Sequence, residues 1–178
     1  MTTKTTKLGL SKPAPGSVSW TAEFNANLDT LDAMGYVTTP LSRNMLTSDP
    51  DVTDTGTWAR TRDSAYLYCG HFANSTAADA DAFSVKFRCP AGTYTLRFNA
   101  PKRNDVGIVK PYIDGVQKGD AGGYDLYAAS ADNLNCVEIT GLTLTAGEHT
   151  LKFKIDGKNA SSSGYRFRAS GINLQRTA

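Results

Sequence analysis

The residues best suited to chemistry lie in one polar, glycine-rich segment, KGDAGGYDLYAASADNLN, residues 118–135. Aromatic rings can lie against the apolar face of a sugar ring, and carboxylates and amides beside them can hydrogen-bond its hydroxyl groups. A second segment, NASSSGYRFR, adds an amide, a tyrosine and an arginine. Together they predict a carbohydrate-binding site made of Tyr124, Asp125, Tyr127, Asp132, Asn133, Asn159, Tyr165 and Arg166.

The tyrosines also allow a second interpretation. Tyr124 and Tyr127 could instead be core or interface aromatics, because tyrosine is common in both environments. Exposed rings would favour sugar binding, whereas rings buried in a protein contact would favour a structural role.

Catalysis has little support in the sequence. There are two histidines, His71 and His149, and His149 stands directly before a predicted strand, where we expect it to pack or cap. No GxSxG, HExxH or phosphate-loop motif is present, and the acidic groups resemble solvated loop residues. A glycosidase needs two carboxylates at a defined separation, which loop aspartates can satisfy by chance. We therefore expect no enzymatic activity, no cofactor and no metal site.

The composition also narrows the possible functions of the chain. The chain has 178 residues, of which 40% are hydrophobic and 20% charged, which suits one domain with an extension. The net charge is +2 and the basic residues are scattered, so we expect no nucleic-acid binding. No apolar run is long enough to span a bilayer and no secretory signal is recognisable, so membrane insertion is not expected. The three cysteines, Cys69, Cys89 and Cys136, are predicted to be reduced core residues.

The chain divides into an N-terminal arm and helix (1–36), a linker (37–55) and a head domain (56–178). The arm ends in KPAPGS, and helical spacing follows through Trp20, Phe24, Leu28 and Leu31. An isolated helix of about four turns is marginally stable in water, so its apolar stripe must be covered by a partner.

From Trp58 onward the apolar residues alternate with polar ones, as in TYTLRFNA and HTLKFKID. Further strands are predicted in AYLYCGHF, AFSVKFRC, GIVKPYID, CVEITGLTL and GYRFRASGINLQ. Their short, even spacing predicts a mainly β protein, an antiparallel sandwich or barrel. Pro111 predicts an edge strand or a bulge, and the two Ile-Asp-Gly triplets predict turns.

The stretch LGLSKPAPGSVSW, followed by FNANLDTLDA, resembles the start of many bacteriophage tail and fibre proteins, where it attaches the protein to the virion. The resemblance implies that copies of the helix, or another virion protein, cover the apolar stripe. The residues expected to anchor the chain are Leu8, Leu10, Pro13, Trp20, Phe24, Leu28 and Leu31.

The C-terminal part resembles the galactose-binding-like jelly rolls of carbohydrate-binding modules. The order of GTYTLRF, PYIDG, DLY, LTLTAGEHTLKFKIDGKN and GYRFRASGINL carries this resemblance. It implies a jelly-roll sandwich that binds carbohydrate. The calcium-ligand cluster that some of these modules use has no clear counterpart here.

These observations lead to one functional hypothesis and one alternative. In the first, the chain is a bacteriophage fibre or spike, made in the host cytoplasm and located in the virion. It would be a homotrimer that contacts capsid, portal-proximal or tail proteins and binds host-surface polysaccharide. In the alternative, it is a structural capsid or tail decoration protein without receptor binding. A free carbohydrate-binding module of an enzyme is a further alternative, less supported because no catalytic domain accompanies it.

Overall fold

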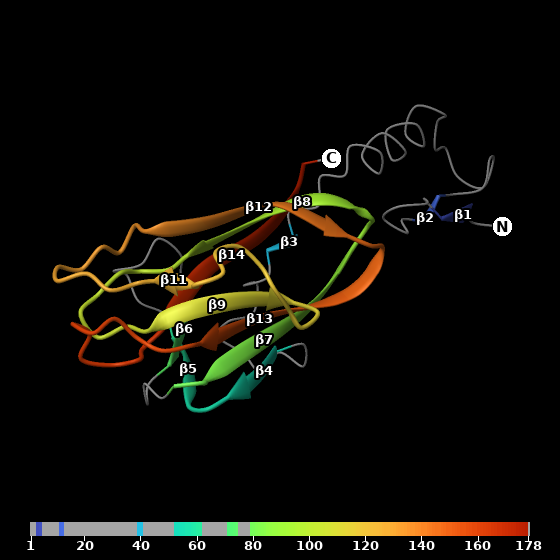
Figure 1. Ribbon diagram of the computed structural model, residues 1–178. Helices are drawn as coiled ribbons and strands as arrows, with labels where there is room; N and C mark the ends of the chain where they lie inside the picture. The colour runs from blue at the N-terminus through green and yellow to red at the C-terminus, as the bar shows by residue number, and fades with distance from the viewer. Residues whose placement is uncertain are drawn as a thin grey trace.

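The described strands pair into two antiparallel sheets that pack face to face (Figure 1). Of the predicted strand AYLYCGHF, all but His71 and Phe72 lies outside the described residues. The computed structural model describes residues 3–4, 11–12, 39–40, 52–61, 71–74 and 79–177. The prediction of a mainly β, antiparallel sandwich of the jelly-roll type is confirmed. The predicted N-terminal helix, with Trp20, Phe24, Leu28 and Leu31, lies outside the described residues, as do Leu8, Leu10 and Pro13.

Each sheet has six strands. The first has the order β10 (Val116–Gln117), β9 (Ile108–Ile113), β13 (Gly147–Ile155), β7 (Ala82–Cys89) and β4 (Val52–Thr55), and β11 (Tyr124–Asp125) also pairs with β9. The second has the order β12 (Cys136–Leu144), β8 (Gly92–Asn99), β14 (Arg168–Arg176), β6 (His71–Asn74) and β5 (Trp58–Thr61), and β3 (Thr39–Pro40) pairs with β14. A separate pair is formed by β1 (Thr3–Lys4) and β2 (Ser11–Lys12).

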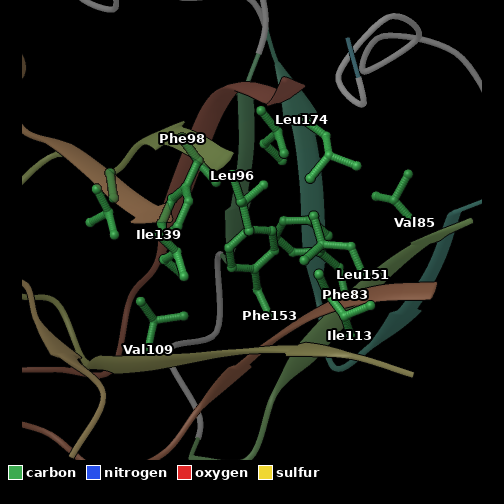
Figure 2. Close-up of a cluster of buried hydrophobic side chains, with 14 of the residues drawn as sticks. Phe83, Val85, Leu96, Phe98, Val109, Ile113, Ile139, Leu151, Phe153 and Leu174 are labelled. Atoms are coloured by element: carbon green, nitrogen blue, oxygen red, sulfur yellow. The ribbon is translucent and has the colours of Figure 1, made fainter. Parts of the chain in front are cut away.

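The core lies between the sheets and is rich in aromatic rings (Figure 2). Phe153 of β13 is fully buried, and its ring centroid lies 5.2 Å from that of Phe83 and 4.7 Å from that of Phe98. The alternating positions of β7, β8 and β13 point inward, as their period of two predicts. Burial of this apolar surface is the main stabilising contribution to the sandwich.

A bulge keeps the apolar side chains of β12 on one face. The register with β8 shifts between Ile139 and Leu142, and Gly141 has a positive φ of 70°. The extra residue of the bulge lets Leu142 and Leu144 point inward, like Val137 and Ile139 before it. Without it, the apolar residues would change face halfway along the strand.

Pro111 lies in β9, next to the edge of the first sheet. Its carbonyl accepts a hydrogen bond from Lys118 N at 2.9 Å, so the nitrogen of the same residue also faces this outer side. Only the short strands β10 and β11 pair there, at 112–113 and 108–109, and Pro111 falls between them. The missing N–H therefore removes no bond from the ladder with β13. The sequence predicted an edge strand or a bulge here, but β9 is the second strand of the sheet and tolerates proline because its outer side is unpaired by β10 and β11 at this residue.

The two ends of the sandwich differ. At one end, the two-residue connections 90–91 and 145–146 join the sheets, and Asp114–Gly115 closes the tight turn between β9 and β10. At the opposite end, on the left in Figure 1, three longer connections, 100–107, 126–135 and 156–167, come together. We call these the turn end and the loop end.

His149 connects two segments of the turn end by hydrogen bonds. It occupies an inward position of β13 and is only 6% exposed, which confirms that it packs. Its Nδ1 lies 2.6 Å from Asp114 Oδ2 and its Nε2 lies 2.9 Å from the Thr145 carbonyl oxygen. Asp114 Oδ1 in turn accepts a hydrogen bond from Thr150 N at 2.8 Å. One side chain thus connects the turn of the first sheet to the connection between the sheets.

Three details differ from the sequence analysis. Parts of the predicted linker belong to the sandwich, because β3 pairs with β14 and β4 pairs with β7. Cys89 is buried, as predicted, but Cys136 is exposed because it stands on the outward phase that alternates with Val137. Asp114–Gly115 forms the predicted tight turn, whereas Asp156–Gly157 closes no hairpin and stays bonded to Ile108. The division into domains remains a prediction.

Candidate carbohydrate-binding site

A pocket of about 380 Å³ lies along the open edge of the sandwich, between β11 of one sheet and the start of β12 of the other. Its lining consists of Lys102, Asp120, Gly123, Tyr124, Asp125, Leu126, Asn135, Cys136, Val137 and Glu138. Two of the eight residues predicted from the sequence, Tyr124 and Asp125, are therefore in its wall.

Tyr124 forms part of the pocket wall and also packs against the core. Its ring is half-buried and meets Phe98 edge to face, with centroids 6.4 Å apart. Its hydroxyl oxygen lies 3.4 Å from Asp120 N, and Gly119 leaves room for it, because a Cβ at that position would collide with the hydroxyl. The ring is thus held in place, and part of it remains available to a ligand.

Asp125 connects the pocket to two loops. Its Oδ1 accepts a hydrogen bond from Tyr127 N at 2.9 Å, and its Oδ2 accepts one from Asn159 Nδ2 at 2.6 Å. Asn159 Oδ1 accepts from Ser161 N at 2.9 Å. Both carboxylate oxygens are therefore engaged, so Asp125, Tyr127 and Asn159 form one network that supports the pocket wall.

Asp132 and Asn133 are held against the end of β8. Lys102 and Asp132 exchange two backbone hydrogen bonds of 2.9 Å, which fixes the segment beside the pocket. The buried Asn99 side chain donates to the carbonyl oxygens of Asn133 at 3.1 Å and Asn135 at 2.8 Å. The side-chain oxygen of Asn133 is buried and has no hydrogen-bond partner among the described residues.

Tyr165 and Arg166 lie at the loop end but outside the pocket lining. Lys158 Nζ stands 5.1 Å from the centroid of the half-buried Tyr165 ring. Arg166 Nη1 donates to Asp105 Oδ2 at 2.9 Å. The structure therefore places Tyr124 and Asp125 in the pocket wall and Tyr127 and Asn159 in the network that supports it. Asp132 and Asn133 are held beside Lys102 and Asn99, Tyr165 lies beside Lys158, and Arg166 binds Asp105.

The chemistry of the pocket suits hydroxyl groups. One cation, Lys102, and three carboxylates, of Asp120, Asp125 and Glu138, line it together with the Asn135 amide. Glu138 is also paired with Arg97, whose Nε lies 2.5 Å from Glu138 Oε2. A ring face bordered by mixed donors and acceptors is the arrangement that protein sites use for polar ligands with apolar faces.

Several residues of this region were missing from the sequence prediction. Lys102, Arg103 and Asp105 belong to the clause PKRND, which follows a predicted strand, and its density of charge was the available signal. Nothing in the sequence around Cys136 and Glu138 predicted a site. They line the pocket because they occupy outward-facing positions of β12.

Two further observations concern the part of the chain that the structure describes. It contains no cluster of three or more His, Cys, Asp or Glu side chains arranged to hold a metal ion. It also contains no helix with the length and apolar character needed to cross a membrane.

Comparison with known proteins gives fold similarity only. No protein-family model and no curated protein sequence matches the chain. A xanthan lyase from Paenibacillus aligns with a TM-score of 0.57 and 22% identity over 71% of this chain and 12% of the lyase. The chain thus spans a small part of that enzyme, and the similarity supports the sandwich fold.

Two other structures align with lower scores. A family 35 carbohydrate-binding module from Clostridium thermocellum has a TM-score of 0.45 and 18% identity, covering 71% of this chain and 93% of the module. The enzymatically active domain of tailspike protein 4 of bacteriophage CBA120 has a TM-score of 0.46 and 15% identity, covering 71% of this chain and 19% of that one.

Proposed function

We propose that the chain is a non-enzymatic bacteriophage virion protein, a fibre or spike, whose sandwich binds host-surface polysaccharide. The observation that carries the binding function is the pocket beside Tyr124, in which a ring held against Phe98 is bordered by Lys102, Asp120 and Asn135. Such side chains can hydrogen-bond sugar hydroxyls while the ring contacts the apolar face of the sugar.

The virion assignment rests on the N-terminal resemblance. In this proposal residues 1–36 dock on capsid, portal-proximal or tail proteins, and three copies assemble. Several linked heads would raise the avidity of a weak sugar site about 10²- to 10⁴-fold without any new contact. The alternative remains a capsid or tail decoration protein without receptor binding.

Binding of purified bacterial surface polysaccharides on a glycan array, by the full chain, tests the proposal. We expect Tyr124→Ala to weaken binding about tenfold or more, since a central aromatic contact typically contributes this much. Tyr124→Phe should retain most of it if the ring face is the main contact. Tyr112→Ala is the matched control, because Tyr112 is half-buried on the outer face of β9, away from the pocket.

The outcomes separate the two functions. Binding that Tyr124→Ala reduces and Tyr112→Ala does not supports the receptor-binding protein. A wild-type chain that enters particles but binds no bacterial polysaccharide favours the decoration protein. Thermal unfolding of each variant shows whether a loss of binding reflects a loss of fold.

A further inference from the structure

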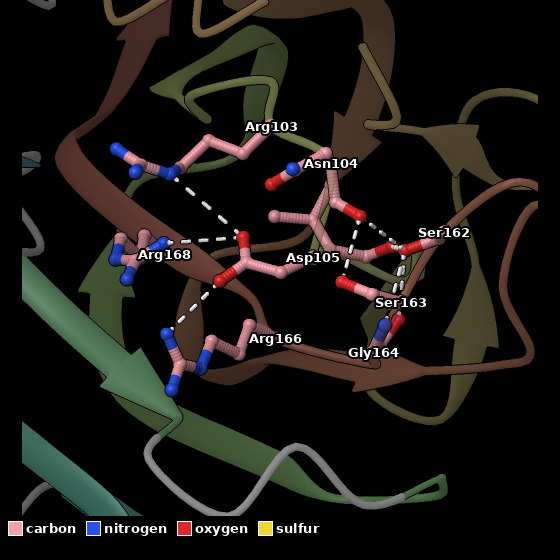
Figure 3. Close-up of polar contacts among 9 residues, drawn as sticks. Arg103, Asn104, Asp105, Ser162, Ser163, Gly164, Arg166 and Arg168 are labelled. Carbon is pink, nitrogen blue, oxygen red and sulfur yellow. Dashed lines mark hydrogen bonds and ion pairs between the residues drawn. The ribbon is translucent and has the colours of Figure 1, made fainter. Parts of the chain in front are cut away.

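Three arginine side chains converge on one carboxylate at the loop end. Figure 3 shows the guanidinium groups of Arg103, Arg166 and Arg168 directed at Asp105. The distances from Asp105 oxygens are 3.8 Å to Arg103 Nε, 2.9 Å to Arg166 Nη1 and 4.0 Å to Arg168 Nη1. We call these four residues the arginine cluster.

The cluster has more positive charge than Asp105 can compensate. Only the 2.9 Å contact of Arg166 is short enough to be a hydrogen bond. Arg103 Nε, Arg168 Nη1 and Asp105 Oδ1 are buried atoms without a hydrogen-bond partner among the described residues. Within those residues, no other carboxylate lies within ion-pair distance of the three guanidinium groups.

The cluster is held by the fold and is accessible from outside. The buried Ser162 donates to the Val106 carbonyl oxygen at 2.7 Å, and Ser163 N donates to that of Asn104 at 2.9 Å, so the backbone on both sides of Asp105 is fixed. The side chains of Arg103 and Arg166 are 37% and 42% exposed. A ligand can therefore reach two of the three guanidinium groups.

We propose that the arginine cluster binds an oxyanion substituent, a carboxylate or a phosphate, of an acidic polysaccharide. Guanidinium groups match the geometry of both oxyanions and form short, charge-assisted hydrogen bonds with them. An oxyanion bound beside Arg103 and Arg166 would compensate the excess positive charge around Asp105. The inference rests on the proposed function, because it specifies the class of polysaccharide.

The cluster and the pocket are separate parts of one surface. Lys102 and Arg103 are consecutive in an extended segment, so their side chains point to opposite sides. Lys102 lines the pocket, whereas Arg103 faces Asp105. A polymer can thus place a neutral sugar in the pocket and a charged substituent on the cluster, and the two contacts can be tested independently.

Titration of the full chain with small anions tests the cluster directly. The arginine Nε–H signals of the ¹⁵N-labelled protein are followed during addition of glucuronate, inorganic phosphate or glucose at constant ionic strength. We expect saturable shifts of the Arg103 and Arg166 signals with an oxyanion, and none with glucose. A response to glucuronate alone identifies a carboxylate, and a response to phosphate alone identifies a phosphate. The absence of a saturable shift with both anions would overturn the proposal.

A pair of charge-matched variants completes the test. Arg103→Gln should weaken binding of the effective anion about tenfold, as expected for loss of a charged hydrogen-bond donor. Arg103→Lys should restore part of it. Arg88→Gln changes the net charge equally but lies at the turn end, beside Glu148, and should have no effect. Equal weakening by Arg103→Gln and Arg88→Gln would mean that net charge acts without a site.

The two proposals can fail separately. If polysaccharide binding depends on Tyr124 while neither anion perturbs the arginine signals, the inference fails and the proposed function stands. If an anion binds the cluster but no polysaccharide binds the chain, the proposed function fails and the cluster is an anion site of another kind.

Discussion

At the scale of the residue, His149 and Asp114 form a charged pair whose effect depends on pH. Burial disfavours the charged imidazole, but the hydrogen bonds to Asp114 and the Thr145 carbonyl, with the Asp114 charge, outweigh it and raise the pKa of His149 above 6.5. Burial likewise opposes the charge of Asp114, yet the bonds from His149 and Thr150 and nearby positive charge lower its pKa below 3.8.

The two pKa shifts predict the pH range in which this pair stabilises the fold. The stabilisation that His149 contributes to the fold is complete below pH 6.5 and is lost as the pH rises through the pKa of His149 in the folded protein. The stabilisation that Asp114 contributes is complete above pH 3.8 and is lost as the pH falls through the pKa of Asp114 in the folded protein. The pair is therefore most stabilising between these values.

Asp114→Asn tests this prediction, because asparagine tolerates the positive φ of 51° and can still accept the bond from Thr150. We expect the variant to reduce the free energy of unfolding by about 1 kcal/mol near about pH 5.5, since Asp114 is half exposed, and by less near about pH 9. Urea unfolding at both pH values measures the difference. An equal loss at both would show that the charge of the pair contributes nothing.

Individual site residues were only partly predictable from the sequence. Tyr124 and Asp125 could be chosen because an aromatic ring beside polar side chains in a glycine-rich segment is a recognisable local pattern. Asn159 and Arg166 were chosen as direct ligands, but they bond to Asp125 and to Asp105. Such pairing depends on loops that are distant in the sequence, so local composition could not reveal it.

At the scale of the element, regular strands were predicted well. The predicted strands AFSVKFRC and CVEITGLTL have the bounds of β7 and β12, because each is a short apolar-rich run that buries one face in the core. The strands β3 and β4 were not predicted, since they are short and three of the four β4 residues are exposed. β14 begins only at Arg168, because the preceding residues belong to the connection that Ser162 fixes.

The segment between β10 and β11 shapes the pocket, and glycine substitutions can test this. Gly115 and Gly119 have φ values of +80° and +77°, so alanine at either should cost about 1 kcal/mol of stability. A Cβ at position 119 would collide with the Tyr124 hydroxyl, whereas a Cβ at position 115 would contact nothing within 4 Å.

We therefore expect Gly119→Ala to weaken polysaccharide binding and Gly115→Ala to leave it unchanged, with a larger loss of stability for Gly119→Ala because Tyr124 must shift. Binding isotherms and thermal unfolding of both variants measure the two effects. Equal effects on binding would indicate that the position of the Tyr124 ring is unimportant.

At the scale of the whole molecule, we propose that residues 1–36 anchor the chain to the virion and that the strands from β3 onward fold without them. Deletion of residues 1–36 should leave a folded protein that no longer enters virions, because β3, β4 and all later strands remain in the chain. Circular dichroism and quantification of the protein in purified particles measure these properties. Incorporation of the shortened chain at the normal level would show that the anchor lies elsewhere.

We propose that the pocket beside Tyr124 holds polysaccharide, and the thiol of Cys136 allows this to be measured directly. This thiol is exposed and lines the pocket, whereas Cys89 is buried in the core. Alkylation of the full chain is followed for each cysteine by peptide mass spectrometry, with and without a host-surface polysaccharide that the chain binds on the array. Bound polysaccharide should slow the alkylation of Cys136 several-fold and leave Cys89 unreactive throughout. Unchanged alkylation of Cys136 at saturating polysaccharide would show that the sugar binds elsewhere on the molecule.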